Sequence, residues 1–374
     1  MAEDYLLEPG LVHLNTGTYG AQPRAVHERT VAAMRQFERN PVLQGYKLTG
    51  DSVLAQAEAA RIAIGAFFGA GPDEILLTHG TADALGQCAQ ALELRASERI
   101  LTSGAEHDSG VLCWRWLARR RGGFLDAVPL GPDELDDDII VARFEQAIRR
   151  ETRVVCVSDV IAWTGQRLPI ARLAALANAH GALMVVDGAQ SVGHVPVDLA
   201  ALGVDAYAGS GHKWLLGPKG SGFLHVRKDP ALRIFPVAWE DQARLNSEAM
   251  GGCPLPQAIG LGEAVAMLQR DGVEARLAHN RALREQLWEM LRTVPGITPV
   301  GPPPGHRESN GLLGFKLPDG VDAVRLRSTL LAKYRINIRA VDARQWNGLR
   351  ASLHVYNDRF CAHTLVNALR RELD

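Results

Sequence analysis

One lysine in this chain stands where a neutral amine could attack a carbonyl group. Lys213 lies in the sequence Ser-Gly-His-Lys-Trp, between two apolar segments, 204–209 and 222–226, that are predicted to be short buried strands. Lysine is almost never fully buried without a partner, and burial beside other cations lowers its pKa toward the nucleophilic neutral form. Ser210 and His212 add a hydroxyl and an imidazole that can donate to a phosphate. Taken alone, the sequence also fits a surface lysine on an ordinary turn.

A carboxylate ends an apolar segment that precedes this lysine. The segment 183–187 is predicted to be a strand that ends in Asp187, and Gln190 follows three residues later. Ligands of open α/β sheets bind at the carboxyl ends of the strands. Asp187 could therefore pair with the protonated pyridine nitrogen of pyridoxal phosphate, which keeps the ring an electron sink, and Gln190 could donate to its phenolic oxygen. A helix cap or a metal ligand is the alternative for Asp187, but no cluster of histidines or carboxylates in the sequence supports a metal.

Two strand-to-helix junctions offer further contacts to such a cofactor. Gly80 and Thr81 follow a predicted strand and open a helix, where backbone amides and a hydroxyl could form a cup for a phosphate. His107 follows the next predicted strand, and its imidazole could stack on an aromatic ring. Each junction also has an ordinary alternative, a plain turn in the first case and a structural histidine in the second.

Arg350 lies inside a predicted strand at 349–355. A buried guanidinium is costly unless it is paired, and the carboxylate of an amino-acid substrate would give it a planar, bidentate partner. The alternative is an internal salt bridge to an aspartate or glutamate.

The elements that would position these residues alternate between strand and helix. From about residue 74 to residue 226 this alternation predicts βαβ units and a mostly parallel sheet. Helices are predicted before it at about 24–38 and 52–68, and Asp51 is the candidate N-cap of the second.

The pattern changes after about residue 250. Long amphipathic helices over about 256–294 are followed by strands, one of them at 336–340, and by further helices, which predicts a smaller α+β domain. The predicted division is a large α/β domain over 20–250 and a small α+β domain formed by 1–19 and 251–374.

Composition limits the classes of partner and the compartment. The 374 residues include 41 lysines and arginines against 42 aspartates and glutamates, so no charge excess favours nucleic acid or an anionic membrane. Five widely spaced cysteines without a Cys-x-x-Cys pair argue against a zinc site or a disulfide framework and suit a reducing cytoplasm. No signal peptide is visible, and no segment approaches the roughly 18 apolar residues of a membrane span.

Together these residues resemble the class V aminotransferase family of fold type I pyridoxal phosphate enzymes. The resemblance covers nearly the whole chain and is closest in pattern to isopenicillin N epimerase-like proteins and to the cysteine desulfurase and selenocysteine lyase branch. Segments 15–17 and 37–42 are similar to the epimerase-like side. The motifs that carry the resemblance are Glu106-His107, Asp187 with Gln190, Ser210-Gly211-His212-Lys213, Arg350-Ala351-Ser352 and Tyr356-Asn357.

The resemblance implies a homodimer with active sites at its interface, and a large domain with a seven-stranded type of sheet between helices. It implies that Lys213 holds pyridoxal phosphate as a Schiff base and moves protons, that His107 stacks on the ring, and that Arg350 binds the substrate carboxylate. We also assign Asn15 and Trp163 to the substrate side.

One departure from the family shapes the functional prediction. Desulfurases carry a nucleophilic cysteine on a loop shortly before the Arg-Ala-Ser strand, whereas residues 339–348 contain none and form a shorter loop. The Gly-Thr pair that usually reaches the partner subunit's phosphate is also replaced, around 251–253. We therefore expect a C–S lyase that eliminates a thiol from an amino acid. An epimerase or aminotransferase of secondary metabolism, or a ligand-binding protein without catalysis, is the alternative.

Overall fold

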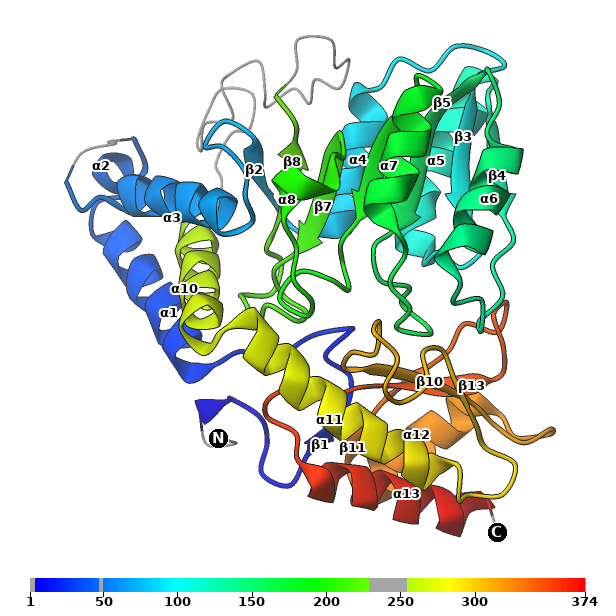
Figure 1. Ribbon diagram of the computed structural model, residues 1–374. Helices are drawn as coiled ribbons and strands as arrows, with labels where there is room; N and C mark the ends of the chain where they lie inside the picture. Colours follow the sequence, from blue (N-terminus) through cyan, green and yellow to red (C-terminus); the bar gives the residue numbers. More distant parts are fainter. Residues whose placement is uncertain (1–3, 47–49, 229–253, 374) are drawn as a thin grey trace.

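A seven-stranded sheet forms the centre of the larger part of the molecule (Figure 1). The computed structural model describes residues 4–46, 50–228 and 254–373. The strand order is β2-β8-β7-β6-β5-β3-β4, in which β8 is antiparallel to both neighbours and the other adjacent pairs are parallel, as the alternating pattern predicted. The strands are β2 (Ile75–Thr78), β3 (Arg99–Ser103), β4 (Phe124–Val128), β5 (Thr152–Ser158), β6 (Leu183–Asp187), β7 (Ala206–Ser210) and β8 (Gly222–Val226).

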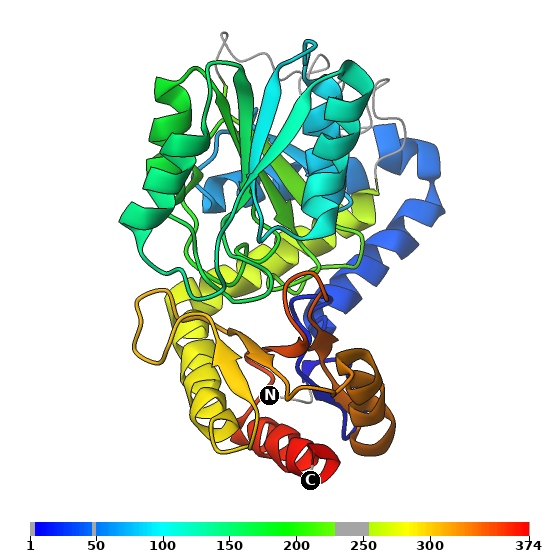
Figure 2. The ribbon, with the colours of Figure 1, turned by 90° about the vertical axis from the view of Figure 1, so that its right-hand side faces the viewer.

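Helices cover both faces of this sheet (Figure 2). Alternate residues of one strand face opposite sides, so Val185 packs with the cluster that includes α4 and α5, whereas Val186 packs with the cluster that includes α3, α6, α7 and α10. Burial on both faces explains why the central strands are almost continuously apolar. The helices of this part are α1 (Arg24–Arg39), α2 (Pro41–Tyr46), α3 (Val53–Phe67), α4 (Thr81–Ala91), α5 (Asp108–Arg121), α6 (Asp137–Ala147), α7 (Ile170–Ala179), α8 (Leu199–Leu202) and α10 (Leu255–Asp271).

The smaller part is built on a four-stranded antiparallel sheet with the order β12-β13-β10-β9. Helices α11 and α13 pack together beside it, and their apolar faces join the strands in a second hydrophobic cluster. A separate parallel pair, β1 with β11, attaches the N-terminal segment to this part. The elements are β1 (Val12–His13), α11 (Val273–Leu291), β9 (Thr298–Val300), β10 (Leu312–Lys316), α12 (Ala323–Tyr334), β11 (Ile336–Asn337), β12 (Arg339–Ala340), β13 (Gly348–Ser352) and α13 (Arg359–Leu373).

Three local predictions need correction. The N-cap of α3 is Ser52 and not Asp51, because the Ser52 hydroxyl accepts a hydrogen bond from Ala55 N at 3.2 Å. The strand expected at 336–340 is two short strands that pair in different sheets, β11 with β1 and β12 with β13. The short elements α2, α8, β1 and β9 were not predicted, since each has too few residues to show a periodic pattern.

The boundary between the two parts lies inside the pair of long helices. Helix α10 packs on α1 and α3 and contributes Leu255 and Leu268 to the core of the larger part, whereas Leu283 of α11 belongs to the second cluster. Gly272 separates the two helices with a φ of +81°. We therefore propose a division near Gly272 in place of the one predicted at 250. In the described ranges, no helix combines the length and the apolar character needed to cross a membrane.

Candidate active site

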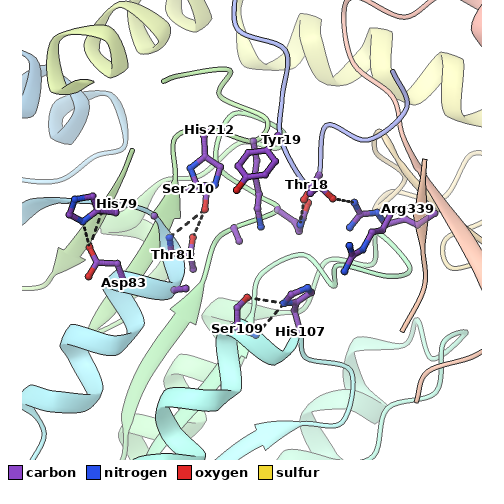
Figure 3. Close-up of a pocket in the computed structure, with 17 residues that line it drawn as sticks. Thr18, Tyr19, His79, Thr81, Asp83, His107, Ser109, Ser210, His212 and Arg339 are labelled. Atoms are coloured by element: carbon purple, nitrogen blue, oxygen red, sulfur yellow. Dashed lines mark hydrogen bonds and ion pairs between the residues drawn. The ribbon is translucent and has the colours of Figure 1, made fainter. Parts of the chain in front are cut away.

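A cavity of about 450 Å³ opens where the carboxyl ends of β2, β3, β6 and β7 meet the β12–β13 pair of the smaller part (Figure 3). Its size is that of a site for a small organic ligand. The residues that line it are Gly17, Thr18, Tyr19, His79, Gly80, Thr81, Ala82, Asp83, His107, Ser109, Ala189, Gln190, Ser210, His212, Lys213, Arg339 and Arg350. Eight of the eleven residues that the sequence assigned to the site are among them; Asp187, Asn15 and Trp163 are not.

Lys213 is held in place by the residues around it. Trp214 is fully buried, stacks on His194 with ring centroids 3.4 Å apart, and donates from Nε1 to Gln190 Oε1 at 2.8 Å. On the other side, a β-carbon at Gly20 would lie 2.1 Å from the carbonyl oxygen of Lys213, so only glycine lets the N-terminal segment approach this closely. The backbone on both sides of the lysine is therefore fixed.

The electrostatic surroundings of Lys213 favour a neutral amine. Its pKa is lowered to about 8, chiefly by burial; Asp187 opposes the decrease, and the charges of Arg350 and Arg339 add to it. Burial in turn raises the pKa of Asp187, against the pull of Lys213. Asp187 Oδ1 accepts a hydrogen bond from the amide of Ala189 at 2.8 Å. The amine of Lys213 lines the cavity, and Asp187, which is not a lining residue, acts on that amine through its charge.

The end of the cavity at the N-terminus of α4 suits a phosphate. Helix α4 begins there with no side-chain N-cap, and Thr81 Oγ1 lies 2.9 Å from Ser210 Oγ. Amides at a helix N-terminus and hydroxyls together bind anions. Gly80 has a φ of +147°, and a β-carbon there would lie 3.0 Å from His212 Cε1, so the absence of a side chain keeps this end open.

His212 differs from the sequence prediction in its hydrogen bonding. Its Nδ1 lies 3.2 Å from the carbonyl oxygen of Ser221, which can only accept, so Nδ1 carries the hydrogen. Burial and the charge of Lys213 lower the pKa of His212 to about 4, and the neutral ring has no second N–H for a phosphate. It could donate to a phosphate only as an imidazolium, the form that a nearby anion favours.

His107 and Trp163 form one stacked unit. Their ring centroids are 5.3 Å apart with an interplanar angle of 23°. Ser109 N donates to His107 Nδ1 at 3.2 Å, so the hydrogen of the neutral ring lies on Nε2. Burial and the charge of Lys213 lower the pKa of His107 to about 4, which keeps the ring neutral. Trp163 is only 2% exposed and supports His107 from behind. Trp163 does not line the cavity, and its contact with substrate stays a prediction.

Arg350 faces the cavity without an acidic partner. Its Nη1 donates to Ala162 O at 3.1 Å, and its Nη2 donates to Asn15 Oδ1 at 3.1 Å and to Thr18 Oγ1 at 3.3 Å. Its Nε has no partner, and within the described ranges no carboxylate pairs with it, which removes the alternative of an internal salt bridge there. Asn15 thus orients Arg350 and does not line the cavity, and its contact with substrate stays a prediction.

Several lining residues were not assigned to the site from the sequence. Gln190 was assigned to the site and does line the cavity, where its Nε2 donates to Gly17 O at 2.9 Å. Thr18, Tyr19 and Arg339 were missed. For Arg339 a signal existed, because it too is an arginine inside a predicted strand. The region around 251–253, where a family motif is replaced, lies outside the described residues.

Glu106 lies next to the site, and its protonation makes the stability of the folded protein depend on pH. It accepts hydrogen bonds from Ser103 Oγ at 2.6 Å and from Ser158 N at 3.0 Å. Burial raises its pKa from 4.5 to about 7, so the folded protein holds this proton more tightly than the unfolded chain. The resulting stabilisation is complete below pH 4.5 and is lost as the pH rises through 7.

We expect Glu106→Gln to remove this pH dependence, because the amide keeps an acceptor and a donor but does not titrate. Urea midpoints of the variant and of the unmodified protein, each measured at about pH 5 and about pH 8, would give the slope of stability against pH for both. Equal slopes for the variant and the unmodified protein would show that Glu106 does not titrate in this window.

The site offers a partner for each polar group of pyridoxal phosphate. The helix N-terminus with Thr81 and Ser210 suits the phosphate, the amine of Lys213 suits the aldehyde, and the carboxylate of Asp187 suits the ring nitrogen. Room for the carboxylate depends on a glycine, since a β-carbon at Gly110 would lie 2.6 Å from Asp187 Oδ2. Among the described residues, no group of three or more histidine, cysteine or carboxylate side chains could hold a metal ion.

Comparisons with known proteins agree with this chemistry. A sequence model described as Aminotransferase class-V matches residues 15–360. Isopenicillin N epimerase of Amycolatopsis lactamdurans is 32% identical and the alignment covers 98% of this chain and 96% of the relative. A cysteine desulfurase of Klebsiella pneumoniae is 31% identical over 82% of this chain and 78% of the relative.

Solved structures share the fold. The cystine C-S lyase C-DES superposes with a TM-score of 0.83 at 23% identity, covering 97% of this chain and 98% of that one. The Escherichia coli cysteine desulfurase CsdA superposes with a TM-score of 0.81 at 25% identity, covering 100% of this chain and 97% of that one. The predicted family, fold type and cofactor are thereby confirmed: the chain belongs to the class-V aminotransferase family of pyridoxal phosphate enzymes.

Proposed function

We propose that this enzyme acts at Cα of an amino acid and eliminates a thiol from a sulfur-linked side chain, as a C–S lyase. The observation that carries the proposal is a cavity that contains Lys213 and Arg350 and, among the residues that the structure describes, no thiol. The segment that enters β13 contains no cysteine either. Burial raises the pKa of the described cysteines, away from the reactive thiolate, and none of them lines the cavity: Cys88, Cys113, Cys156 and Cys361. Cys253 lies outside the described residues.

Each residue has a defined task in this proposal. Pyridoxal phosphate, when bound, supplies the electron sink that stabilises negative charge at Cα. The amine of Lys213, with its pKa lowered to about 8, takes the proton from Cα and returns protons later. Asp187 keeps the pyridine nitrogen protonated, and Arg350 holds the α-carboxylate. Elimination breaks the Cβ–S bond, and with one water consumed the products are a thiol, pyruvate and ammonia.

The direct test is to incubate the enzyme with S-alkyl cysteines and with cysteine. We expect thiol and pyruvate in equal amounts from the conjugates, and no persulfide on the protein by mass spectrometry after turnover of cysteine. A protein-bound persulfide, or consumption of the conjugates without pyruvate, would contradict the lyase assignment.

Epimerisation is the second candidate, and two observations favour it. The isopenicillin N epimerase relative aligns over 98% of this chain, and Lys213 and His107 both line the cavity as separate proton-bearing groups. An epimerase would exchange the Cα proton for deuterium with inversion and without pyruvate, which chiral chromatography in D2O would detect.

Arg350→Ala should weaken capture of an amino acid by about one to two orders of magnitude, since a charge-assisted hydrogen bond contributes roughly 1.5–3 kcal/mol. Affinity for the decarboxylated amine should not change. Titration of the cofactor absorption with the amino acid and with the matching amine measures both constants. Arg350→Lys is the control, because it retains charge but not the bidentate geometry. A variant that binds both ligands as the unmodified enzyme does would rule out this role.

We further propose a cytoplasmic homodimer with the cavities at its interface. The family resemblance supports the dimer, and the described cysteines, which are all unpaired, suit a reducing compartment. Sedimentation of the holoenzyme would test the oligomeric state.

A further inference from the structure

A second arginine faces the cavity beside Arg350. Arg339 in β12 is the direct cross-strand partner of Arg350 in β13, and both line the cavity. Side chains at directly opposed positions of an antiparallel pair share a face of the sheet, with β-carbons about 4.5–5.5 Å apart. Like charges in this arrangement destabilise the sheet. The pair therefore requires a compensating anion.

The nearby carboxylates do not supply this anion. Asp108 and Asp342 each lie 2.6 Å from Arg344, on the segment that links β12 to β13. Within the described ranges, neither Arg339 nor Arg350 has a carboxylate at ion-pair distance. Burial is the main cause that lowers the pKa of Arg350, and the like charge of Arg339 is the second; together they bring it to about 9.

The two guanidinium groups differ in how deeply they are buried and in how firmly hydrogen bonds hold them. Arg350 is 2% exposed and fixed by Ala162, Asn15 and Thr18, so it presents one defined docking geometry. Arg339 is only partly buried, and Figure 3 shows it on the side of the cavity opposite to Thr81. It is therefore remote from the end that suits the phosphate. An anion at Arg339 is therefore a group other than the phosphate of the cofactor.

We propose that Arg339 is a specificity-determining residue that binds a second anionic group, carried on the side chain of the amino-acid substrate. Arg350 then holds the α-carboxylate, and the preferred substrate class is a dianionic amino acid, such as a cysteine thioether whose sulfur substituent ends in a carboxylate. This inference rests on the proposed function, because it assigns the α-carboxylate to Arg350.

Two ligands of almost the same shape test it on the holoenzyme. S-carboxymethylcysteine carries the second charge, and S-carbamoylmethylcysteine replaces that carboxylate by a neutral amide. Dissociation constants come from titration of the cofactor absorption, and KM and kcat from thiol release. We expect the enzyme to bind the charged ligand at least about tenfold more tightly, with the difference in KM and not in kcat.

Arg339→Gln should abolish this preference and leave the dissociation constant of the amide unchanged, whereas Arg339→Lys should retain part of the preference. Arg335→Gln is the matched control, because it removes the same charge from an exposed arginine that pairs with Glu8 and does not line the cavity. Equal binding of both ligands by the unmodified enzyme would overturn the inference. An equal loss of affinity for both ligands in Arg339→Gln would also overturn it, since Arg339 would then act on the α-carboxylate that both ligands carry. Failure of the proposed function looks different: neither ligand, nor alanine, would change the cofactor absorption.

Discussion

Lys213→Ala should give a protein that takes up pyridoxal phosphate without a covalent link and that eliminates thiol at least about a thousandfold more slowly. The expectation follows from the position of the amine: it lies at the base of the cavity, on a backbone fixed by Trp214 and Gly20. Methylamine is too small to be held by these contacts, so it should restore only part of the rate.

Borohydride reduction followed by peptide mass spectrometry measures the covalent link directly. The unmodified enzyme should carry the reduced cofactor on the peptide that contains Lys213, and the variant should carry none. Lys219→Ala is the control: Lys219 donates to Gly20 O at 2.7 Å from the same turn but does not line the cavity. A reducible cofactor adduct on another lysine of the Lys213→Ala protein would refute the assignment.

Asp187→Asn should retain the cofactor but lose activity by roughly a hundredfold or more. An amide cannot hold the pyridine nitrogen protonated, so the loss falls on the state with negative charge at Cα and not on binding of the cofactor. The carboxylate also raises the pKa of Lys213, so the variant should titrate its lysine at lower pH. Asp187→Glu should not rescue the rate, because the longer side chain would move the carboxylate from the position that the amide of Ala189 holds.

The measurements are kcat, the cofactor dissociation constant and the pH profile of the cofactor absorption. Asp159→Asn is the contrasting control, since Asp159 is fully buried and pairs with Arg167 and Tyr207 away from the cavity. It should lower the unfolding temperature and leave the profile unchanged. Turnover near the unmodified rate in Asp187→Asn would remove the role assigned to this carboxylate.

The sequence was most informative where local pattern decides structure. The sheet could be predicted because its parallel strands are buried on both faces and therefore apolar throughout. The split of 336–340 into two strands could not, because elements of two residues are defined by their partners in space. Ser52 and Asp51 are both good caps, and only the backbone decides between them.

The site residues, too, divide into those that local pattern could place and those that only the folded structure could place. Lys213 and Asp187 lie where strands end, so their shared edge follows from the topology. The contacts of Asn15 with Arg350 and of Trp163 with His107 could not be predicted, because a motif does not show which way a side chain faces. Arg339 was missed because its position opposite Arg350 follows only from the pairing of the two-residue strand β12 with β13.

The N-terminal segment has a consequence for biosynthesis. Its strand β1 pairs with β11, and Asn15 reaches Asn337 across 322 positions of sequence. Gly20, a few residues on, packs against the carbonyl of Lys213. This segment therefore has no docking place until β11 has been made. Closing so long a loop is entropically costly and slow. A nascent chain stalled before residue 336 should bind pyridoxal phosphate only weakly, because Gly20 would not yet be held against the backbone of Lys213.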